Sequence, residues 1–421
     1  MTKLQWPLFA GEIVVSNWIT HDELNAMIPP GATVYIGGST GEPQHTLRQF
    51  QPEGPCHFFQ QPLAAVNKLD FSTFGNGSQQ STCFMTPALA ASAAAGRVHF
   101  IPMQMRAIYD YLRDRQFDFA LLLAAADIHG ELRYAMNNDY PGAVIGSGTK
   151  IIVEVSDQFT APLNALPVAD SAHFLIRGIT PAIHYPVAEI DATSQRIGEH
   201  VASLIRDGDC LQTGIGAVPA AVLAGLTDRN DLGMHSGIID DAAMALIQSG
   251  NLNGAAKAVD TGKHIAGMVL GTGALAEWLT TENSVIFRGA DYTHDPSVIR
   301  QLDNFVSVNS AVEIDLDGQV NAEVAGGRQI SGTGGSVDFM RAAKLSKGGR
   351  SIVALSATAR GGSVSRIVTR VEKLTALRTD VDIVVTEFGI AELKTASLRE
   401  RAERLINIAH PDFRDELRST L

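Results

Sequence analysis

Glycine-rich loops are the parts of this sequence best suited to bind a ligand. The run Gly214-Ile215-Gly216-Ala217-Val218-Pro219 lies between a short apolar stretch, Cys210–Thr213, and a helix-like stretch, Ala220–Leu226. A turn from a strand into a helix presents free backbone N–H groups at the positive end of the helix, which favours the binding of an anion. The run matches neither a Walker loop nor a complete dinucleotide-binding motif, and it is also typical of a tight turn that binds nothing.

Three further loops combine glycine with polar residues. Gly326-Gly327-Arg328 is followed by Gly332–Phe339 (GTGGSVDF), and so much glycine lets the backbone approach a ligand closely. Gly361–Arg366 (GGSVSR) carries an arginine of the kind that meets phosphate, although a basic residue exposed to solvent is the commoner meaning. Gly37–Gly41 (GGSTG) either shapes the acyl side of a cleft or is only a turn.

The elements that must position these loops alternate between strand-like and helix-like segments. Apolar or β-branched runs predict buried strands at Thr33–Ile36, Asp118–Leu123, Lys150–Val155, Ser351–Leu355 and Asp382–Thr386. Helical patterns occur at Asp22–Met27, Met103–Arg113 and Leu398–Ile406. This alternation predicts an α/β fold with mainly parallel sheets.

Two segments of the chain resemble each other, and they predict two related domains. Leu24–Pro43 and Val201–Ala220 each read as a helix, a glycine break, a short apolar strand and a glycine-rich loop. Gly31 aligns with Gly208 in this comparison. We therefore expect an N-terminal α/β domain over residues 1–187 and a C-terminal α/β domain over residues 188–421.

The composition is that of a globular protein and excludes several functions. The chain has 421 residues, of which 45% are hydrophobic and 19% are charged, and its formal net charge of -12 argues against a nucleic-acid partner. The three cysteines are widely scattered, so neither a disulfide framework nor a zinc site is expected. No HxH or HExxH spacing occurs, and His264, His294 and His410 lie far apart, so we expect no metal.

The sequence also predicts the compartment. The first residues, MTKLQWPLFAGEIV, have neither the apolar core nor the cleavage site of a signal peptide, and no stretch has the ~18 apolar residues of a membrane helix. We therefore expect a cytoplasmic protein with no membrane partner.

Five segments match, in order, the sequence patterns of one enzyme family. They are LIRDGDCLQTGIGAVPAAVL, VNSAVEIDLDGQVNAE, SGTGGSVDFMRAA, ATARGGSVSRIV and the C-terminal VVTEFGIAELKTASLRERAERLINIAHPDFRDEL, and the N-terminal half matches more loosely. Together they resemble the acetyl-CoA hydrolase/CoA-transferase family, which includes 4-hydroxybutyrate and acetate CoA-transferases.

The resemblance implies a CoA-transferase-like pair of α/β domains, with the acyl side of a cleft in the first and coenzyme A bound mainly by the second. It implies an acyl-CoA thioester as substrate, a carboxylate as a possible acceptor, and a homodimer. By resemblance, the CoA contacts are Gly214, Ile215, Gly216, Ala217, Val218, Gly334 and Gly335, with Val312 lining the same pocket.

The family's nucleophile is missing from this chain. In the family, a glutamate in the pattern His-Thr-Glu-Met attacks the thioester and becomes a glutamyl-CoA thioester. This sequence has His235-Ser236-Gly237-Ile238, in a register fixed by Leu232–His235 before it and Asp241 after it. Gly237 therefore stands at the position of the glutamate, and it has no side chain that could attack.

Three alternatives follow. Water could attack the thioester directly, with His235, Asp240 or Asp241 as general base, which would make the chain an acyl-CoA hydrolase. Another carboxylate could be the nucleophile of a CoA-transferase, and Glu323, beside the glycine-rich loop, is the candidate. The chain could also bind CoA species without turnover, or use them in another acyl transfer. A histidine such as His235 is more often a packed or hydrogen-bonded residue than a catalytic one, and Asp241 is typical of a helix start.

The low aromatic content of 6% favours a small acyl group.

Overall fold

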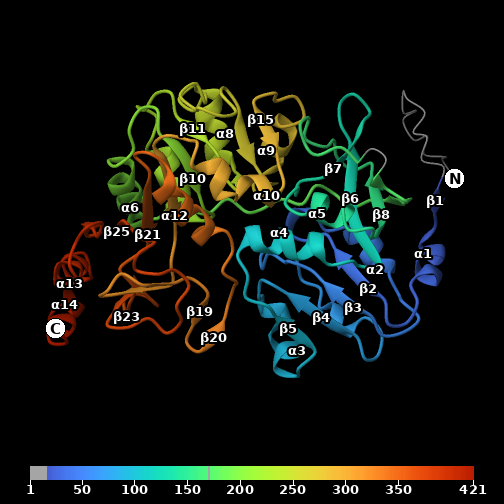
Figure 1. Cartoon of the computed structure of the whole chain (residues 1–421), viewed down its shortest axis with the longest axis horizontal. Coiled ribbons are helices and arrows are strands. Elements are labelled where there is room, and N and C mark those ends of the chain that lie inside the picture. Colours follow the sequence, from blue (N-terminus) through green and yellow to red (C-terminus); the bar gives the residue numbers. More distant parts are fainter. Residues whose placement is uncertain (1–16, 169–170) are drawn as a thin grey trace.

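The computed structural model describes residues 17–168 and 171–421, and it contains two sheets that lie side by side (Figure 1). The N-terminal segment on which the signal-peptide prediction depends lies outside the described residues. In the described part of the chain, no helix is both long and apolar enough to cross a bilayer.

The N-terminal sheet has parallel pairing throughout, except where β7 (Leu132–Tyr134) runs antiparallel to β6. Its strands lie in the spatial order β1 (Trp18–Ile19), β9 (Phe174–Gly178), β8 (Lys150–Ser156), β6 (Phe119–Ala126), β2 (Thr33–Ile36), β3 (His57–Phe59), β4 (Gln79–Thr82) and β5 (Val98–Phe100). The helices around it are α1 (His21–Met27), α2 (Gln44–Gln49), α3 (Ala90–Ala94), α4 (Met105–Asp114) and α5 (Pro141–Ile145), with 3-10 turns η1 (Ser39–Gly41), η2 (Phe71–Thr73) and η3 (Pro87–Leu89).

Both faces of this sheet are buried, which explains the continuous apolar runs of its central strands. In β2, Val34 and Ile36 pack into one core cluster, and Tyr35 between them packs into a second cluster on the other face. In β6, Leu121 and Leu122 are divided in the same way. Successive side chains of a strand point to opposite faces, so a run without polar interruptions is what a doubly covered sheet requires.

The C-terminal sheet is also mainly parallel, and only β26 runs antiparallel to its neighbour. Its strands lie in the order β11 (Gly233–Met234), β10 (Cys210–Thr213), β16 (Phe305–Asn309), β21 (Arg350–Ala354), β25 (Ile383–Thr386) and β26 (Gly389–Glu392). The helices of this half are α6 (Ala192–Ala202), α7 (Ala217–Ala224), α8 (Asp241–Gln248), α9 (Gly273–Trp278), α10 (Ala290–Thr293), α11 (Pro296–Ile299), α12 (Ser336–Leu345), α13 (Leu398–Asn407) and α14 (Pro411–Arg418).

Short ladders complete the C-terminal half. They pair β12 (Ile238–Ile239) with β14 (Met268–Val269), β13 (His264–Ala266) with β15 (Val285–Phe287), β17 (Glu313–Asp315) with β18 (Val320–Asn321) and β24 (Ile367–Val368), β19 (Val324–Ala325) with β20 (Arg328–Gln329), and β22 (Thr358–Ala359) with β23 (Val364–Ser365). The predicted α/β fold with mainly parallel sheets is confirmed.

The two aligned glycines adopt the same unusual conformation. Gly31 precedes β2 with φ +87°, and Gly208 precedes β10 with φ +79°. This left-handed region is rarely open to residues with a Cβ, so each chain reversal before a strand requires glycine. The predicted domain boundary at 187/188 lies between β9 and α6.

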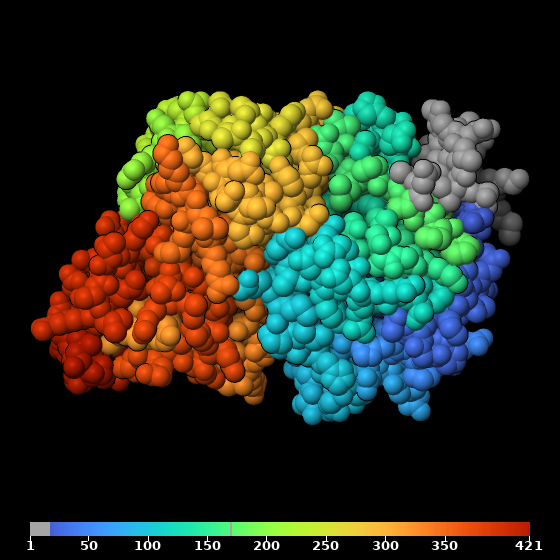
Figure 2. All heavy atoms as spheres, viewed as in Figure 1, coloured from blue at the N-terminus to red at the C-terminus, as the bar shows by residue number. Residues whose placement is uncertain are grey.

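The halves are joined by backbone hydrogen bonds as well as by side chains. Met105 N–H donates to Gly334 O over 3.2 Å, and Val269 N–H donates to Met136 O over 2.7 Å. Figure 2 shows the cyan and green atoms of the N-terminal half meeting the yellow and orange atoms of the C-terminal half along a broad boundary in the middle of the molecule. Side chains at this boundary can therefore form one site from both halves.

Candidate active site

A cavity of about 180 Å³ lies between the two halves of the molecule. Its wall includes residues that directly follow the carboxyl ends of parallel strands, such as Gly38 after β2 and Gly214 after β10. Ligands of open α/β sheets bind at this edge, because the loops that leave the strands are free to vary without disturbing the sheet. The cavity therefore lies where both sheets are able to present functional loops.

Most of the cavity wall is apolar. Leu63, Phe84 and Met105 come from the N-terminal half, and Ile238, Met268, Leu270 and Phe339 come from the C-terminal half. The volume is small compared with the ~300–1,000 Å³ of a site for a drug-sized ligand. The cavity is thus suited to a short aliphatic group rather than to a large substrate.

Asp139 is the most unusual polar residue in this wall. Its side chain is buried, and neither carboxyl oxygen has a hydrogen-bond partner among the described residues. Burial raises the pKa of Asp139 to about 8, so the carboxyl group is largely protonated at neutral pH. The backbone fixes it firmly, because its N–H donates to Asn137 Oδ1 over 3.0 Å and its carbonyl accepts the Ala290 N–H over 2.9 Å.

Two more polar atoms without partners lie in the same wall. The hydroxyl of Tyr140 and Oγ1 of Thr213 are both buried and unpaired within the described residues, and both residues line the cavity. Burial, with the adjacent Asp139 carboxyl, raises the pKa of Tyr140 well above its usual range, so the phenol stays protonated. Buried polar groups are nearly always paired in folded proteins, so this concentration indicates a place for a polar ligand.

Gly237 also lines the cavity, and it lies directly beside His294. A Cβ at position 237 would be 2.9 Å from Cε1 and 3.1 Å from Nε2 of the His294 ring. The imidazole therefore occupies the space into which a side chain at 237 would project. Burial lowers the pKa of His294 to about 3, so the ring is neutral at physiological pH.

The other predicted catalytic residues lie outside this cavity. His235 is fully buried, its Nε2–H donates to Thr293 O over 3.1 Å, and burial lowers its pKa to about 4. Asp241 accepts hydrogen bonds from the Thr272 hydroxyl (2.5 Å) and N–H (3.0 Å), and Asp240 caps α8. Glu323 accepts from Gln329 Nε2 over 3.3 Å, and it is not among the lining residues.

The loop predicted to bind CoA connects this cavity to an outer recess. Gly214 and Ile215 line the cavity, and Ile215 continues into the recess with Gly216, Ala217 and Val218. Gly216 has φ +114°, a conformation that residues with a Cβ rarely adopt, and it begins α7. The recess also contains Arg366 and the amino end of α7, which both favour an anion.

The remaining predicted CoA contacts divide between two places. Gly334 and Gly335 line the inner cavity, whereas Val312 lines neither space and donates its N–H to Asn321 O over 2.8 Å. Within residues 17–168 and 171–421, no three His, Cys, Asp or Glu side chains gather closely enough to hold a metal ion.

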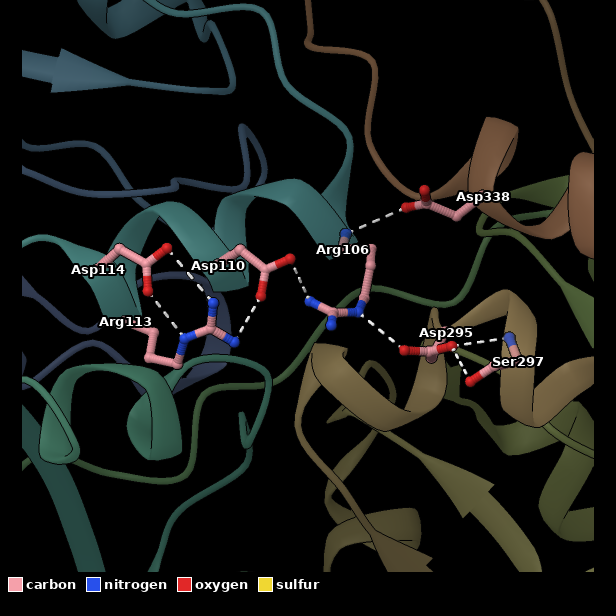
Figure 3. Close-up of polar contacts among 7 residues, drawn as sticks. All are labelled: Arg106, Asp110, Arg113, Asp114, Asp295, Ser297 and Asp338. Atoms are coloured by element: carbon pink, nitrogen blue, oxygen red, sulfur yellow. Dashed lines mark hydrogen bonds and ion pairs between the residues drawn. The ribbon is translucent and has the colours of Figure 1, made fainter.

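An arginine on α4, in the N-terminal half of the chain, contacts two residues of the C-terminal half beside the cavity (Figure 3). Arg106 Nε contacts Asp295 Oδ2 over 3.1 Å, and its backbone N–H donates to Asp338 Oδ2 over 3.1 Å. Asp295 directly follows His294, and Asp338 lies in the first turn of α12, which begins after Gly335. One residue of the N-terminal half thereby positions two parts of the C-terminal wall.

Sequence reasoning missed Asp139, Tyr140 and His294. Asp139 and Tyr140 belong to the segment Asn-Asn-Asp-Tyr-Pro-Gly. Its composition is typical of a turn, so the sequence gives no reason to expect a functional site there. His294 lies in the turn between the short helices α10 and α11, and no motif surrounds it. Gly237 is the sequence signal that could have pointed to a neighbour such as His294. A glycine where the family has a glutamate leaves space, and another side chain has to fill it.

Known proteins resemble this chain in sequence and in structure. The family model for the acetyl-CoA hydrolase/transferase C-terminal domain matches residues 271–421. The 4-hydroxybutyrate coenzyme A transferase of Clostridium kluyveri is 38% identical over 331 residues, which cover 77% of each chain. The chain belongs to the acetyl-CoA hydrolase/transferase family.

Other members of the family agree with this assignment. The acetyl-CoA hydrolase of Kluyveromyces lactis is 32% identical over 243 residues, or 54% of this chain and 45% of the relative. The crystal structure of RipA from Yersinia pestis superposes with a TM-score of 0.87 at 30% identity, covering 96% of each chain. The family thus contains proteins named as transferases and as hydrolases, and the name alone does not fix the reaction of this member.

Proposed function

We propose that this chain hydrolyses short-chain acyl-CoA thioesters by direct attack of water, without a glutamyl-CoA intermediate. The observation that carries the proposal is the cavity at Gly237. The position expected to provide the family's nucleophile has no side chain, yet unpaired polar groups surround a space large enough for a small acyl group. Water is the nucleophile that such a site is able to accommodate.

The state of the cavity argues against a protein that only binds CoA. Large apolar side chains filling the space would favour a silent binder, but a cavity is present there and Asp139 of the N-terminal half is part of its wall. Leaving Asp139 buried without a partner destabilises the folded protein. Such a feature is expected where a ligand completes the hydrogen bonds.

Asp139 is suited to stabilise charge on the thioester oxygen. Its raised pKa keeps a proton on the carboxyl group at neutral pH, so the group is able to donate a hydrogen bond. A carboxylic acid kept neutral by an apolar site can act as an oxyanion donor, and such a donor contributes roughly 10²–10³ in rate. The hydroxyl of Tyr140 is a second donor in the same wall.

We place the CoA portion along the loop from Gly214 to Val218. Ile215 borders both the inner cavity and the outer recess, so the pantetheine arm would pass it with the thioester inside. The phosphates would then lie near Arg366 and the start of α7.

We also propose that the protein is cytoplasmic and forms a homodimer. Light scattering of the purified chain would test the dimer.

CoA transfer to a carboxylate is the second candidate. It is favoured by one observation, that Asp139 supplies a carboxyl group to the cavity and so offers an alternative nucleophile to the missing glutamate. Its raised pKa leaves only a minor ionised fraction at neutral pH, which disfavours attack. We therefore rank hydrolysis first.

A panel of acetyl-, propionyl-, butyryl- and benzoyl-CoA would test the function by following free thiol, with and without acetate or succinate. We expect thiol release from the short aliphatic thioesters, no stimulation by the acids, and ¹⁸O from labelled water in the product acid. Acyl exchange between CoA and an added carboxylate would favour the transferase. CoA binding with neither release nor exchange would overturn the enzymatic proposal.

A further inference from the structure

His294 lies in a slot formed by two glycines. As noted above, a Cβ at Gly237 would be 2.9 Å from the ring, and a Cβ at Gly335 would be only 2.2 Å from Nε2. On another side, the ring of Phe339 packs against the imidazole with 4.4 Å between centroids. Both glycines are therefore required to admit the ring, which is fixed with its edge at the cavity.

The hydrogen bonds around His294 determine which ring nitrogen carries the proton. The Thr293 hydroxyl donates its single proton to Gly289 O over 3.3 Å, and its oxygen lies 2.8 Å from His294 Nδ1. We assign the proton between the two side chains to Nδ1, which then donates to Thr293 Oγ1, because the Thr293 hydroxyl also reaches the Gly289 carbonyl. Nε2 is then the unprotonated nitrogen, and no described residue donates a hydrogen bond to it.

From this geometry we propose that His294 is the catalytic base of the chain and that its Nε2 takes a proton from the attacking water. The proposal rests on the proposed hydrolysis. The water oxygen bonds to the thioester carbonyl carbon as its proton moves to Nε2, and a tetrahedral intermediate forms. When the C–S bond breaks, the departing thiolate of CoA takes the proton from Nε2, so the products are the free acid and CoA thiol.

Burial of the ring is compatible with this role. The lowered pKa keeps Nε2 unprotonated throughout the physiological range, although a ring of such low pKa is a weak base in the resting site. The positive imidazolium that forms during the reaction is stabilised by the negative charge that develops on the tetrahedral intermediate. In a site that excludes water, these two charges stabilise each other more strongly than they would in bulk solvent.

The main test replaces His294 and compares it with a second buried histidine. His294→Gln keeps a polar atom near the Nε2 position but removes the base. His264→Gln is the matched control, since His264 is equally buried, has a pKa lowered to about 3, and does not line the cavity. We expect kcat for acetyl-CoA hydrolysis to fall at least 100-fold in His294→Gln with KM changed less than threefold, and His264→Gln to retain wild-type kcat.

Chemical rescue separates a base from a structural residue. His294→Ala empties the slot, and added imidazole should restore at least a tenth of the lost kcat. A folded His294→Ala protein that has lost activity and is not rescued would overturn the proposal. Detection by mass spectrometry of an acyl group on His294 after acid quenching of the wild-type reaction would also overturn it, because His294 would then be a nucleophile.

A pair of variants at position 237 tests the same geometry without depending on folding of the His294→Gln protein. Gly237→Glu alone places its side chain against the ring, so we expect no covalent CoA adduct. Gly237→Glu combined with His294→Ala frees the space and should give a borohydride-sensitive glutamyl-CoA adduct. An adduct in the single variant would contradict the fixed position of the ring.

These outcomes distinguish the inference from the proposed function. Absence of hydrolysis by the wild-type protein with every acyl-CoA would overturn the proposed function. Hydrolysis by the wild type with equal kcat in a folded His294→Gln protein would overturn the role of His294 and leave the hydrolase in place.

Discussion

A partly exposed polar cluster and a buried one line neighbouring parts of this molecule, and their side chains are satisfied in opposite ways. Around Arg106, each ionisable side chain has a protein partner, including Asp110, Asp295 and Asp338 (Figure 3). In the cavity wall, the carboxyl group of Asp139 has none among the described residues. The paired cluster links the N-terminal and C-terminal halves of the chain, whereas Asp139 is the group for which we propose a ligand as partner. Hydrogen bonds that the protein leaves unmade are therefore a better guide to a candidate site than the number of charges.

The largest expected effect comes from removing the unpaired carboxyl group. Asp139→Leu should lower kcat for acetyl-CoA by about 100- to 1,000-fold, the loss typical of an oxyanion donor. The same change should raise the free energy of unfolding by about 1–3 kcal/mol, because an apolar side chain of similar size replaces a buried group without a partner. Thiol-release kinetics and urea denaturation would measure the two effects.

Asp139→Asn is the matched variant that identifies which form of the carboxyl group acts. An amide still donates a hydrogen bond, so this variant should keep kcat within about tenfold of wild type if the protonated acid is the donor. Equal and complete loss in both variants would instead show that Asp139 acts as a carboxylate, in favour of the transferase.

The paired cluster should respond in the opposite sense, with stability affected more than catalysis. Arg106→Met leaves the half-buried carboxylate of Asp295 without its ion pair, and the free energy of unfolding should fall by about 1–3 kcal/mol. Because Asp295 directly follows His294, kcat should fall as well, but by less than tenfold. Arg106→Lys, which keeps the charge, should recover part of the stability. An Arg106→Met protein that is more stable than wild type would contradict the view that the paired cluster stabilises the fold.

The pH dependence of stability should come partly from the unpaired group. The pKa of Asp139 is raised to about 8, so the folded protein holds a proton that the unfolded chain releases above pH ~4. Stability therefore falls as pH rises towards 8. Between pH 6.5 and 8.5, wild type should lose about 1–2 kcal/mol more than Asp139→Asn in urea titrations. This window avoids the buried histidines, whose lowered pKa values destabilise the fold only as pH falls below about 6.5.

The smallest effect is expected at the exposed end of the paired cluster. Arg113 and Asp114 form an ion pair of 2.9 Å, but both side chains are about half exposed or more. Asp114→Asn should change the free energy of unfolding by less than about 0.5 kcal/mol, since water and salt screen such pairs. A loss as large as that of Arg106→Met would mean that ion pairing, rather than burial, determines the energy of this cluster.

The sequence predicted the framework better than the reacting groups. Cys210–Thr213 and Thr33–Ile36 form strands with the predicted bounds, because buried parallel strands have an unmistakable apolar pattern. Helix α7 begins three residues before its predicted start, since Pro219 is tolerated in the first turn. The halves of the site could not be joined from sequence, because Asp139 and His294 are 155 positions apart and line one cavity only in the folded chain.

The slot around His294 also limits how the chain is able to change over evolutionary time. A carboxylate gained at position 237 meets an occupied space, and loss of the histidine first would leave a protein with neither group in place. A side chain at position 237 or 335 and the His294 ring cannot occupy their present places together, so the three positions can only change as a set.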